Sequence, residues 1–220
     1  DVSYEETAEL VEAQRQEAIR RRMHLVELPA SLKHATLAPH QKDSVILTRS
    51  RTEILSLMSD FIGNFHSPTK KGLYVFGDFG VGKSFLLAAL AHDLSEKYSV
   101  ATTMIHYPSF VVNVKNAIQS GQVKTEIDTV KKADILILDD IGAEQHSPWV
   151  RDDVLQVILQ HRMQENLPTF FTSNFSLADL EKRLSQGKAG DESWQAKRVM
   201  ERIRFLAKEV HLEGENRRHE

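Results

Sequence analysis

The chain has 220 residues, a net charge of −3 and no cysteine. This length suits one large α/β domain, or one domain with an appendage. The charge excludes a global basic field that would attract nucleic acid or membrane, and the lack of cysteine excludes disulfides and Cys-based zinc sites. There is no signal peptide and no apolar run near the ~20 residues that span a bilayer. We therefore expect a cytoplasmic protein without membrane contact. Because the chain begins at Asp1 rather than Met, we also expect a fragment or processed chain that lacks an N-terminal domain.

Residues 1–42 are predicted to be a helix followed by a linker. Ser3-Tyr4-Glu5-Glu6 fits a helix capping box, and the polar helix runs to about Met23. Arg20-Arg21-Arg22 near its end is either a solvated helix end, where cations suit the dipole, or a phosphate or nucleic-acid contact. Residues 27–41 contain two prolines and read as irregular linker.

The remaining chain, 43–220, alternates helical and extended patterns. The predicted strands lie at 73–76, 100–106, 135–138, 169–173 and 209–212. The predicted helices lie at 43–65, 85–94, 110–120, 123–132, 147–163, 177–184 and 194–205. Residues 185–193 are polar, contain two glycines and are predicted to be a loop. This alternation implies a mostly parallel sheet that is covered by helices on both faces.

The first strong motif follows the strand at 73–76. Gly77 to Ser84 fits the phosphate-binding pattern G-x-x-x-x-G-K-[ST], in the strand–loop–helix context that the motif requires. Glycines let backbone N–H groups surround an anion, and the helix adds the positive end of its dipole. Lys83 should reach the β- and γ-phosphates, and Ser84 should offer its hydroxyl to Mg²⁺. The alternative is a glycine-rich turn that precedes Lys-Ser by chance. The predicted nucleotide-binding residues are Gly77, Asp78, Phe79, Gly80, Val81, Gly82, Lys83, Ser84 and Phe85.

Polar residues also end two later strands. Asp139 and Asp140 follow Ile135-Leu136-Ile137-Leu138, a run that is apolar on both faces and suits a central parallel strand. Parallel neighbours end at the same sheet edge, so Asp139 should face the phosphate loop and hold Mg²⁺, directly or through water. Asp140 is the candidate to orient or deprotonate the attacking water. Asn174 ends the next strand and could bind that water or the γ-phosphate. The alternatives are a helix-capping Asp and a turn-forming Asn.

Taken together, these motifs resemble the AAA+ ATPases of the DnaC/DnaI helicase-loader group. The resemblance covers about residues 70–218 and rests on Gly77 to Ser84, Ile135 to Glu144, Thr172-Ser173-Asn174 and Arg198 to Arg204. It implies an AAA+ ATPase domain over 43–220 with a three-layer α/β/α sandwich. The implied parallel sheet has five strands in the order 5-1-4-3-2.

The resemblance also implies roles for single residues. An arginine finger supplied to a neighbouring subunit makes hydrolysis depend on assembly. The alternative for each arginine named below is that it only keeps the surface soluble. The implied roles are Walker A for Lys83 and Ser84, Walker B for Asp139 and Asp140, sensor 1 for Asn174, arginine finger for Arg202 (alternatives Arg198 and Arg204) and sensor 2 for Arg217 (alternative Arg218).

The implied function is ATP-dependent loading of the replicative DNA helicase onto single-stranded DNA, with Mg²⁺ and self-association through the ATP site. The segment 108–132, with Lys115 and Lys124 and with Tyr107 and Phe110 for stacking, would lie near the DNA or be merely structural. The zinc-containing N-terminal domain of such loaders is not expected in a chain without cysteine. Asp140 is a shorter base than the commoner Glu, which suits slow hydrolysis.

Other functions share these motifs. A transposition helper or replication initiator would carry the same ATPase core, and a nucleotide-binding scaffold would bind without turnover. A small-molecule kinase would need an Arg-rich lid, which residues 185–193 do not supply.

Overall fold

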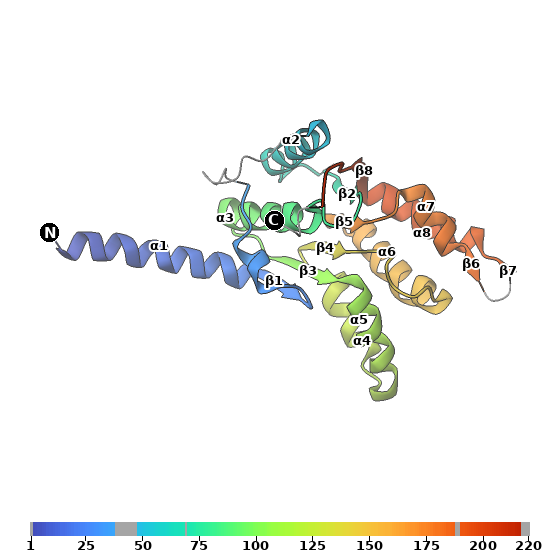
Figure 1. Cartoon of the computed structure of the whole chain (residues 1–220). Helices are drawn as coiled ribbons and strands as arrows, with labels where there is room; N and C mark the ends of the chain where they lie inside the picture. The colour runs from blue at the N-terminus through green and yellow to red at the C-terminus, as the bar shows by residue number, and fades with distance from the viewer. Residues whose placement is uncertain (1, 38–47, 69, 188–189, 217–220) are drawn as a thin grey trace.

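The computed structural model describes residues 2–37, 48–68, 70–187 and 190–216, with the side chains of 2–6 left out (Figure 1). The helices are α1 (Val2–Arg22), α2 (Arg49–Gly63), α3 (Lys83–Tyr98), α4 (Tyr107–Ser120), α5 (Val123–Lys131), α6 (Gln156–Gln164), α7 (Leu177–Leu184) and α8 (Ser193–Leu206). The strands are β1 (Met23–Val26), β2 (Gly72–Phe76), β3 (Thr102–His106), β4 (Ile135–Asp139), β5 (Thr169–Ser173), β6 (Gln186–Gly187), β7 (Gly190–Asp191) and β8 (Ala207–His211). A 3₁₀ helix spans Ala30–His34, and a π-helical stretch spans Val150–Leu155.

The main sheet has six strands in the order β1-β3-β4-β5-β2-β8, and every neighbouring pair is parallel. Numbered in chain order, the five predicted strands are β2, β3, β4, β5 and β8, so the predicted order 5-1-4-3-2 is confirmed for them. The predicted count is wrong by one, because β1 extends the sheet beyond β3. Four residues after a run of arginines carry little strand signal, and their pairing with Thr102 to Ile105 is a long-range contact.

Two hydrophobic cores cover the two faces of the sheet, as the three-layer prediction requires. Side chains of a strand alternate between faces, so Leu136 and Leu138 enter one core while Ile135 and Ile137 enter the other. The first core packs α4 to α8 against the sheet, and the second packs α2, α3 and the end of α1. In Figure 1 the N-terminal part of α1 extends away from the sheet.

Several predicted boundaries need adjustment. The helix predicted at 43–65 starts at Arg49, where Thr48 accepts a hydrogen bond from the Arg51 backbone N–H. The part of that prediction before residue 48 lies outside the described residues. The loop predicted at 185–193 contains the short antiparallel pair β6 and β7. The division at residue 42 stays a prediction, and β1, on its N-terminal side, is hydrogen-bonded to β3. Among the described residues, no helix has the length and apolar character needed to cross a membrane.

Candidate nucleotide-binding and catalytic site

The phosphate loop joins the end of β2 to the start of α3, at the carboxyl edge of the sheet. Gly80 and Gly82 have φ angles of 82° and 96°, a left-handed conformation that favours glycine. Gly77 is restricted for a different reason, since a Cβ there would lie 2.2 Å from the Leu212 carbonyl oxygen. The loop therefore needs its glycines for backbone shape at two positions and for close approach at the third.

Lys83 is almost buried, with 8% of its surface exposed. Its Nζ donates to the carbonyl oxygens of Gly77 and Asp78, at 2.9 and 2.7 Å, and to Asn174 Oδ1 at 3.0 Å. The structure thus brings the predicted sensor residue, Asn174 at the end of β5, to the lysine of the phosphate loop. An ammonium group held by loop oxygens at this position can exchange them for phosphate oxygens without moving far.

Asp139 at the end of β4 lies directly against the start of α3. Ser84 Oγ donates to Asp139 Oδ1 at 2.6 Å, and Thr172 Oγ1 donates to the same oxygen at 2.8 Å. Burial raises the pKa of Asp139, and these two hydrogen bonds oppose the rise. A hydroxyl and a carboxylate at this separation are the hard oxygen ligands that Mg²⁺ prefers. The residues present therefore fit a magnesium site to which Ser84 and Asp139 would contribute oxygen atoms.

Asp140 adopts a left-handed backbone conformation, with a φ of 62°. Its backbone N–H donates to Thr172 Oγ1 at 2.8 Å, which holds the residue beside β5. Its Oδ2 lies 3.6 Å from His106 Nε2, and His106 Nδ1 lies 2.7 Å from Ser109 Oγ. A strained non-glycine backbone is tolerated where its surroundings fix it, and such positions concentrate at functional sites.

His106 is a site residue that the sequence analysis missed. It ends β3, directly opposite Asp139 in the strand register. The same signal that pointed to Asn174, a polar residue at the tip of a parallel strand, was present at His106. Three adjacent strands, β3, β4 and β5, therefore each deliver a polar side chain to this edge of the sheet.

The predicted arginines are less closely tied to the phosphate loop. Arg202 Nε donates to Gln160 Oε1 at 2.6 Å, and its NH1 donates to the Arg198 carbonyl at 2.7 Å, so its described partners lie on α6 and α8. Burial lowers the pKa of Arg202. Arg204 pairs with Glu181 at 3.0 Å. The predicted sensor 2, Arg217, and its alternative Arg218 lie outside the described residues.

The segment that follows β8 forms a second wall of the site, which the sequence analysis did not predict. The Leu212 N–H donates to the Phe76 carbonyl at 2.8 Å, and the Glu213 N–H donates to Ser50 Oγ at 2.9 Å. A Cβ on Gly80 would lie 2.1 Å from Asn216 Oδ1. Residues 212–216 thus lie between the phosphate loop and the start of α2.

The aromatic residues singled out by the sequence have different surroundings. Phe79 and Phe85, in and after the phosphate loop, are 57% and 39% exposed and so are accessible beside the site. Tyr107 and Phe110 are buried in the first core, where α4 packs against the sheet. The prediction that these two rings stack on nucleic-acid bases is wrong, because the helix turns both of them toward the sheet.

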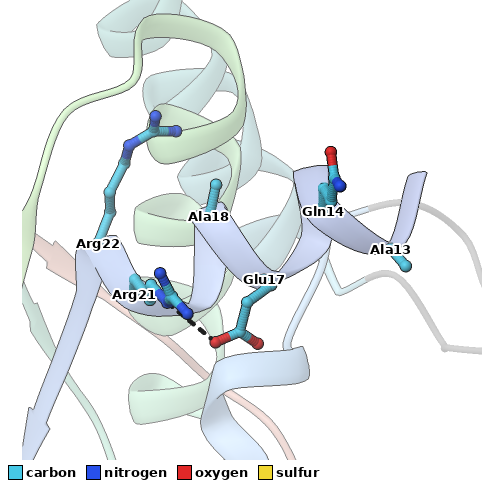
Figure 2. Close-up of a pocket in the computed structure, with 6 residues that line it drawn as sticks. All are labelled: Ala13, Gln14, Glu17, Ala18, Arg21 and Arg22. Atoms are coloured by element: carbon cyan, nitrogen blue, oxygen red, sulfur yellow. Dashed lines mark hydrogen bonds and ion pairs between the residues drawn. The ribbon is translucent and has the colours of Figure 1, made fainter. Parts of the chain in front are cut away.

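A hollow of about 610 Å³ lies along the second half of α1 (Figure 2). It is lined by Ala13, Gln14, Glu17, Ala18, Arg21 and Arg22. Glu17 accepts from Arg20 and Arg21 at 2.9 and 3.1 Å, and Arg22 reaches the Ser95 carbonyl at 3.5 Å. Because these arginines have partners within the chain, the structure favours the interpretation of Arg20-Arg21-Arg22 as a helix end.

The sequence is similar to one protein family and to one curated protein. A family model described as IstB-like ATP binding protein matches residues 1–220. The replicative helicase loader DnaI of Bacillus subtilis (strain 168) is 44% identical over 172 residues, which are 77% of this chain and 55% of that protein. The chain thus spans about half the length of this curated relative.

Two solved structures are also similar. One is a candidate primosome component from Streptococcus pyogenes serotype M3, with a TM-score of 0.76 and 54% identity; the match covers 91% of this chain and 98% of that one. The other is a crystal structure of DnaI, with a TM-score of 0.78 and 36% identity over 88% of this chain and 98% of that one.

Proposed function

The chain belongs to the family of IstB-like ATP binding proteins, and from this we propose that it is a slow ATPase that loads the replicative DNA helicase onto single-stranded DNA. The observation that carries the catalytic part is the 2.6 Å contact between Ser84 and Asp139, which joins the two halves of a nucleotide site. The helicase-loading part is supported by the 44% identity to a protein named as a replicative helicase loader.

The phosphate loop binds the triphosphate through its backbone N–H groups and Lys83. In this step Lys83 exchanges the carbonyls of Gly77 and Asp78 for β- and γ-phosphate oxygens, while Asn174 stays within its reach. Ser84 and Asp139 would supply oxygen ligands to Mg²⁺, which would neutralise charge on the phosphates.

Asp140 orients and deprotonates the attacking water. Its carboxylate extends from a backbone that Thr172 fixes, and His106 stands on its other side. Asn174 holds the γ-phosphate end of the site by a neutral hydrogen bond. Asp140 has a short side chain, so the water must lie close to it, which fits slow turnover.

Arg202 acts on the ATP of a neighbouring copy. Its Nε is bonded to Gln160 on α6, and the guanidinium has further N–H donors that can face a neighbouring copy. An arginine supplied in this way makes hydrolysis conditional on self-association. Arg217 is proposed to contact the γ-phosphate within its own subunit.

The proposed partners are the replicative helicase, single-stranded DNA and further copies of the chain, in the cytoplasm. Lys115 on α4 and Lys124 on α5 are the positive charges proposed to approach the DNA backbone. Residues 1–42 are proposed to link the ATPase domain at 43–220 to a helicase-binding domain.

Phosphate release tests the ATPase proposal. We expect slow release by the wild type, an increase with single-stranded DNA, and loss of release in Asp140→Asn with ATP binding retained. ATP binding without release by the wild type under every condition would leave a scaffold instead. Mixing Arg202→Ala with Lys83→Ala subunits should restore release, because each variant supplies what the other lacks.

Helicase loading is tested separately with the full-length protein. We expect the full-length protein to co-purify with the replicative helicase. We also expect it to place the helicase on a circular single-stranded DNA in an ATP-dependent manner. Failure of both steps, in a protein that binds and hydrolyses ATP, would contradict the loader function and favour a transposition helper or initiator.

A further inference from the structure

A small buried cavity lies behind the loop that follows β4. Its volume is about 10 Å³, and its lining includes Tyr107, Glu144, His146 and Arg151. Tyr107 Oη and His146 Nε2 are buried and have no hydrogen-bond partner among the described residues. Buried polar atoms in native proteins are nearly always paired, so two such atoms at one polar cavity indicate a bound ligand.

The volume of the cavity and the protonation states of Tyr107 and His146 indicate which ligand it holds. A space of this volume accepts about one water molecule. Burial raises the pKa of Tyr107 well above its usual range and lowers the pKa of His146, so the phenol and the imidazole are both neutral at pH 7. A neutral phenol and a neutral imidazole at one cavity suit a water molecule better than an ion, and the side chains of Glu144 and Arg151 on the same lining already bond to Gly142 and Leu184.

One wall of the cavity belongs to the loop that carries the proposed base. Glu144 Oε2 accepts a hydrogen bond from the Gly142 backbone N–H at 2.7 Å. The Glu144 carbonyl in turn accepts from Arg183 at 2.9 Å. Glu144 is 8% exposed, and it fixes the loop that begins at Asp140 from its inner side.

The opposite wall leads to α8. Arg151 is 2% exposed, lies in the π-helical stretch and donates to the Leu184 carbonyl at 2.8 Å. The same guanidinium lies 2.7 Å from Glu192 Oε2. Glu192 is the N-cap residue of α8, the helix that carries Arg202. A single cavity therefore touches both the Asp140 loop and a residue tied to the first turn of α8.

We propose that one water molecule occupies this cavity and bridges Tyr107 to His146, and that Tyr107 is thereby a positioning residue for the Asp140 loop and for α8. The positioning role rests on the proposed ATPase function, whereas the water site does not. The bridge joins α4 to the loop that carries the proposed base, and the Arg151–Glu192 ion pair beside it joins the same cavity wall to the start of α8. Two parts of the reaction that lie on different elements then keep a fixed relation within each subunit.

Urea unfolding of Tyr107→Phe tests the water site. If the hydroxyl is paired with water, its removal should raise the unfolding equilibrium constant about fivefold. If the hydroxyl is unpaired, its removal relieves a buried polar group and should leave the constant unchanged or lower it, which would overturn the proposal. Tyr74→Phe is the matched control, because Tyr74 Oη is also buried but donates to the Phe175 carbonyl at 2.8 Å, so its loss should be destabilising.

Turnover at saturating ATP tests the positioning role. Tyr107→Phe should release phosphate several-fold more slowly than the wild type with unchanged ATP affinity. Tyr98→Phe, at the far end of α3, should match the wild type. Equal turnover in Tyr107→Phe and Tyr98→Phe would overturn the positioning role. A wild type that binds no ATP would instead contradict the proposed function, and the unfolding comparison would still decide on the water.

Discussion

The two ends of the sheet each hold a buried cation against carbonyl oxygens, but they hold it differently. At the carboxyl end, the Lys83 ammonium bonds to Gly77, Asp78 and Asn174. At the amino end, Arg162 is completely buried. Its guanidinium donates to Thr169 Oγ1 and to the carbonyls of Lys131, Ala133 and Pro168, at 2.6 to 3.1 Å.

The difference between these ends lies in the geometry of the two cations. The planar guanidinium has donors in fixed directions, and four partners from segments flanking β4 and β5 match them. Burial lowers the pKa of Arg162 to about 9, which still leaves it charged at pH 7. The Lys83 ammonium is a point charge on a flexible stem, held mainly by its own loop. The first arrangement is a permanent structural link, and the second can exchange partners when a phosphate arrives.

The largest expected effect is on stability, from Arg162→Met. Removing the guanidinium leaves several buried carbonyls without a donor, so the free energy of unfolding should fall by about 4 kcal/mol. Urea unfolding measures this, and the folded fraction should bind ATP normally. Arg204→Met is the control, since Arg204 makes a partly exposed ion pair with Glu181. A similar small loss in both variants would contradict the structural role of Arg162.

Lys83→Ala should give the opposite pattern. We expect ATP affinity to fall on the order of 100-fold, because charge-assisted bonds to the phosphates are lost. The free energy of unfolding should change less than in Arg162→Met, since two of the three Lys83 partners, Asp78 and Asn174, are exposed residues to which water can bond instead. Titration with a fluorescent ATP analogue measures the affinity. Lys97→Ala, an exposed lysine on the same helix, should bind like the wild type; equal affinity in all three proteins would exclude the site.

Alanine substitutions at two glycines with left-handed backbone distinguish general backbone strain from a specific effect on the phosphate loop. Gly80→Ala should lower ATP affinity roughly tenfold and stability by about 1 kcal/mol, because the added Cβ is strained and meets Asn216. Gly121→Ala has a comparable φ of 71° but no atom within 4 Å of the added Cβ. It should lose similar stability and no affinity. An affinity loss of equal size at Gly121 would point to general strain rather than to the site.

The smallest expected effect concerns pH. Burial raises the folded-state pKa of Asp139 above its usual value of 3.8, so the folded protein binds the proton more tightly than the unfolded chain. Without Mg²⁺, the contribution of Asp139 to unfolding free energy should therefore decrease as pH rises from below 3.8 through the raised pKa. Unfolding curves across this pH range should show that the unfolding free energy of Asp139→Asn decreases less with rising pH than that of the wild type. A steeper decrease in the variant would contradict the assigned direction.

Much of the site could be predicted from the sequence, because neighbouring residues set the loop conformation and the strand that carries Asp139. The glycine spacing before Lys83-Ser84 sets the loop's backbone shape, and the apolar run before Asp139 makes a central strand. Parallel strands end at one edge, so the sequence alone places Asp139 opposite the phosphate loop that carries Ser84. The catalytic roles of these residues, and those of Asn174 and the arginines, stay predictions.

Other features depended on contacts between distant segments. The strand β1 has only four residues, and its strand character comes from pairing with Thr102 to Ile105. The burial of Tyr107 and Phe110 depends on which face α4 turns to the sheet, which a helical period alone does not distinguish for aromatic residues. The link from Arg162 to four partners joins residues 131 to 169, and no local pattern encodes such a fork.

By itself, the sequence determined the fold family, the phosphate loop and the strand-end carboxylates, because backbone shape and strand burial are written in neighbouring residues. Only the tertiary structure decided that His106 faces Asp140, that the segment after β8 closes over Gly80, and that Arg202 bonds to Gln160. Those arrangements arise where packing brings side chains from separate elements together, and no spacing along the chain specifies them.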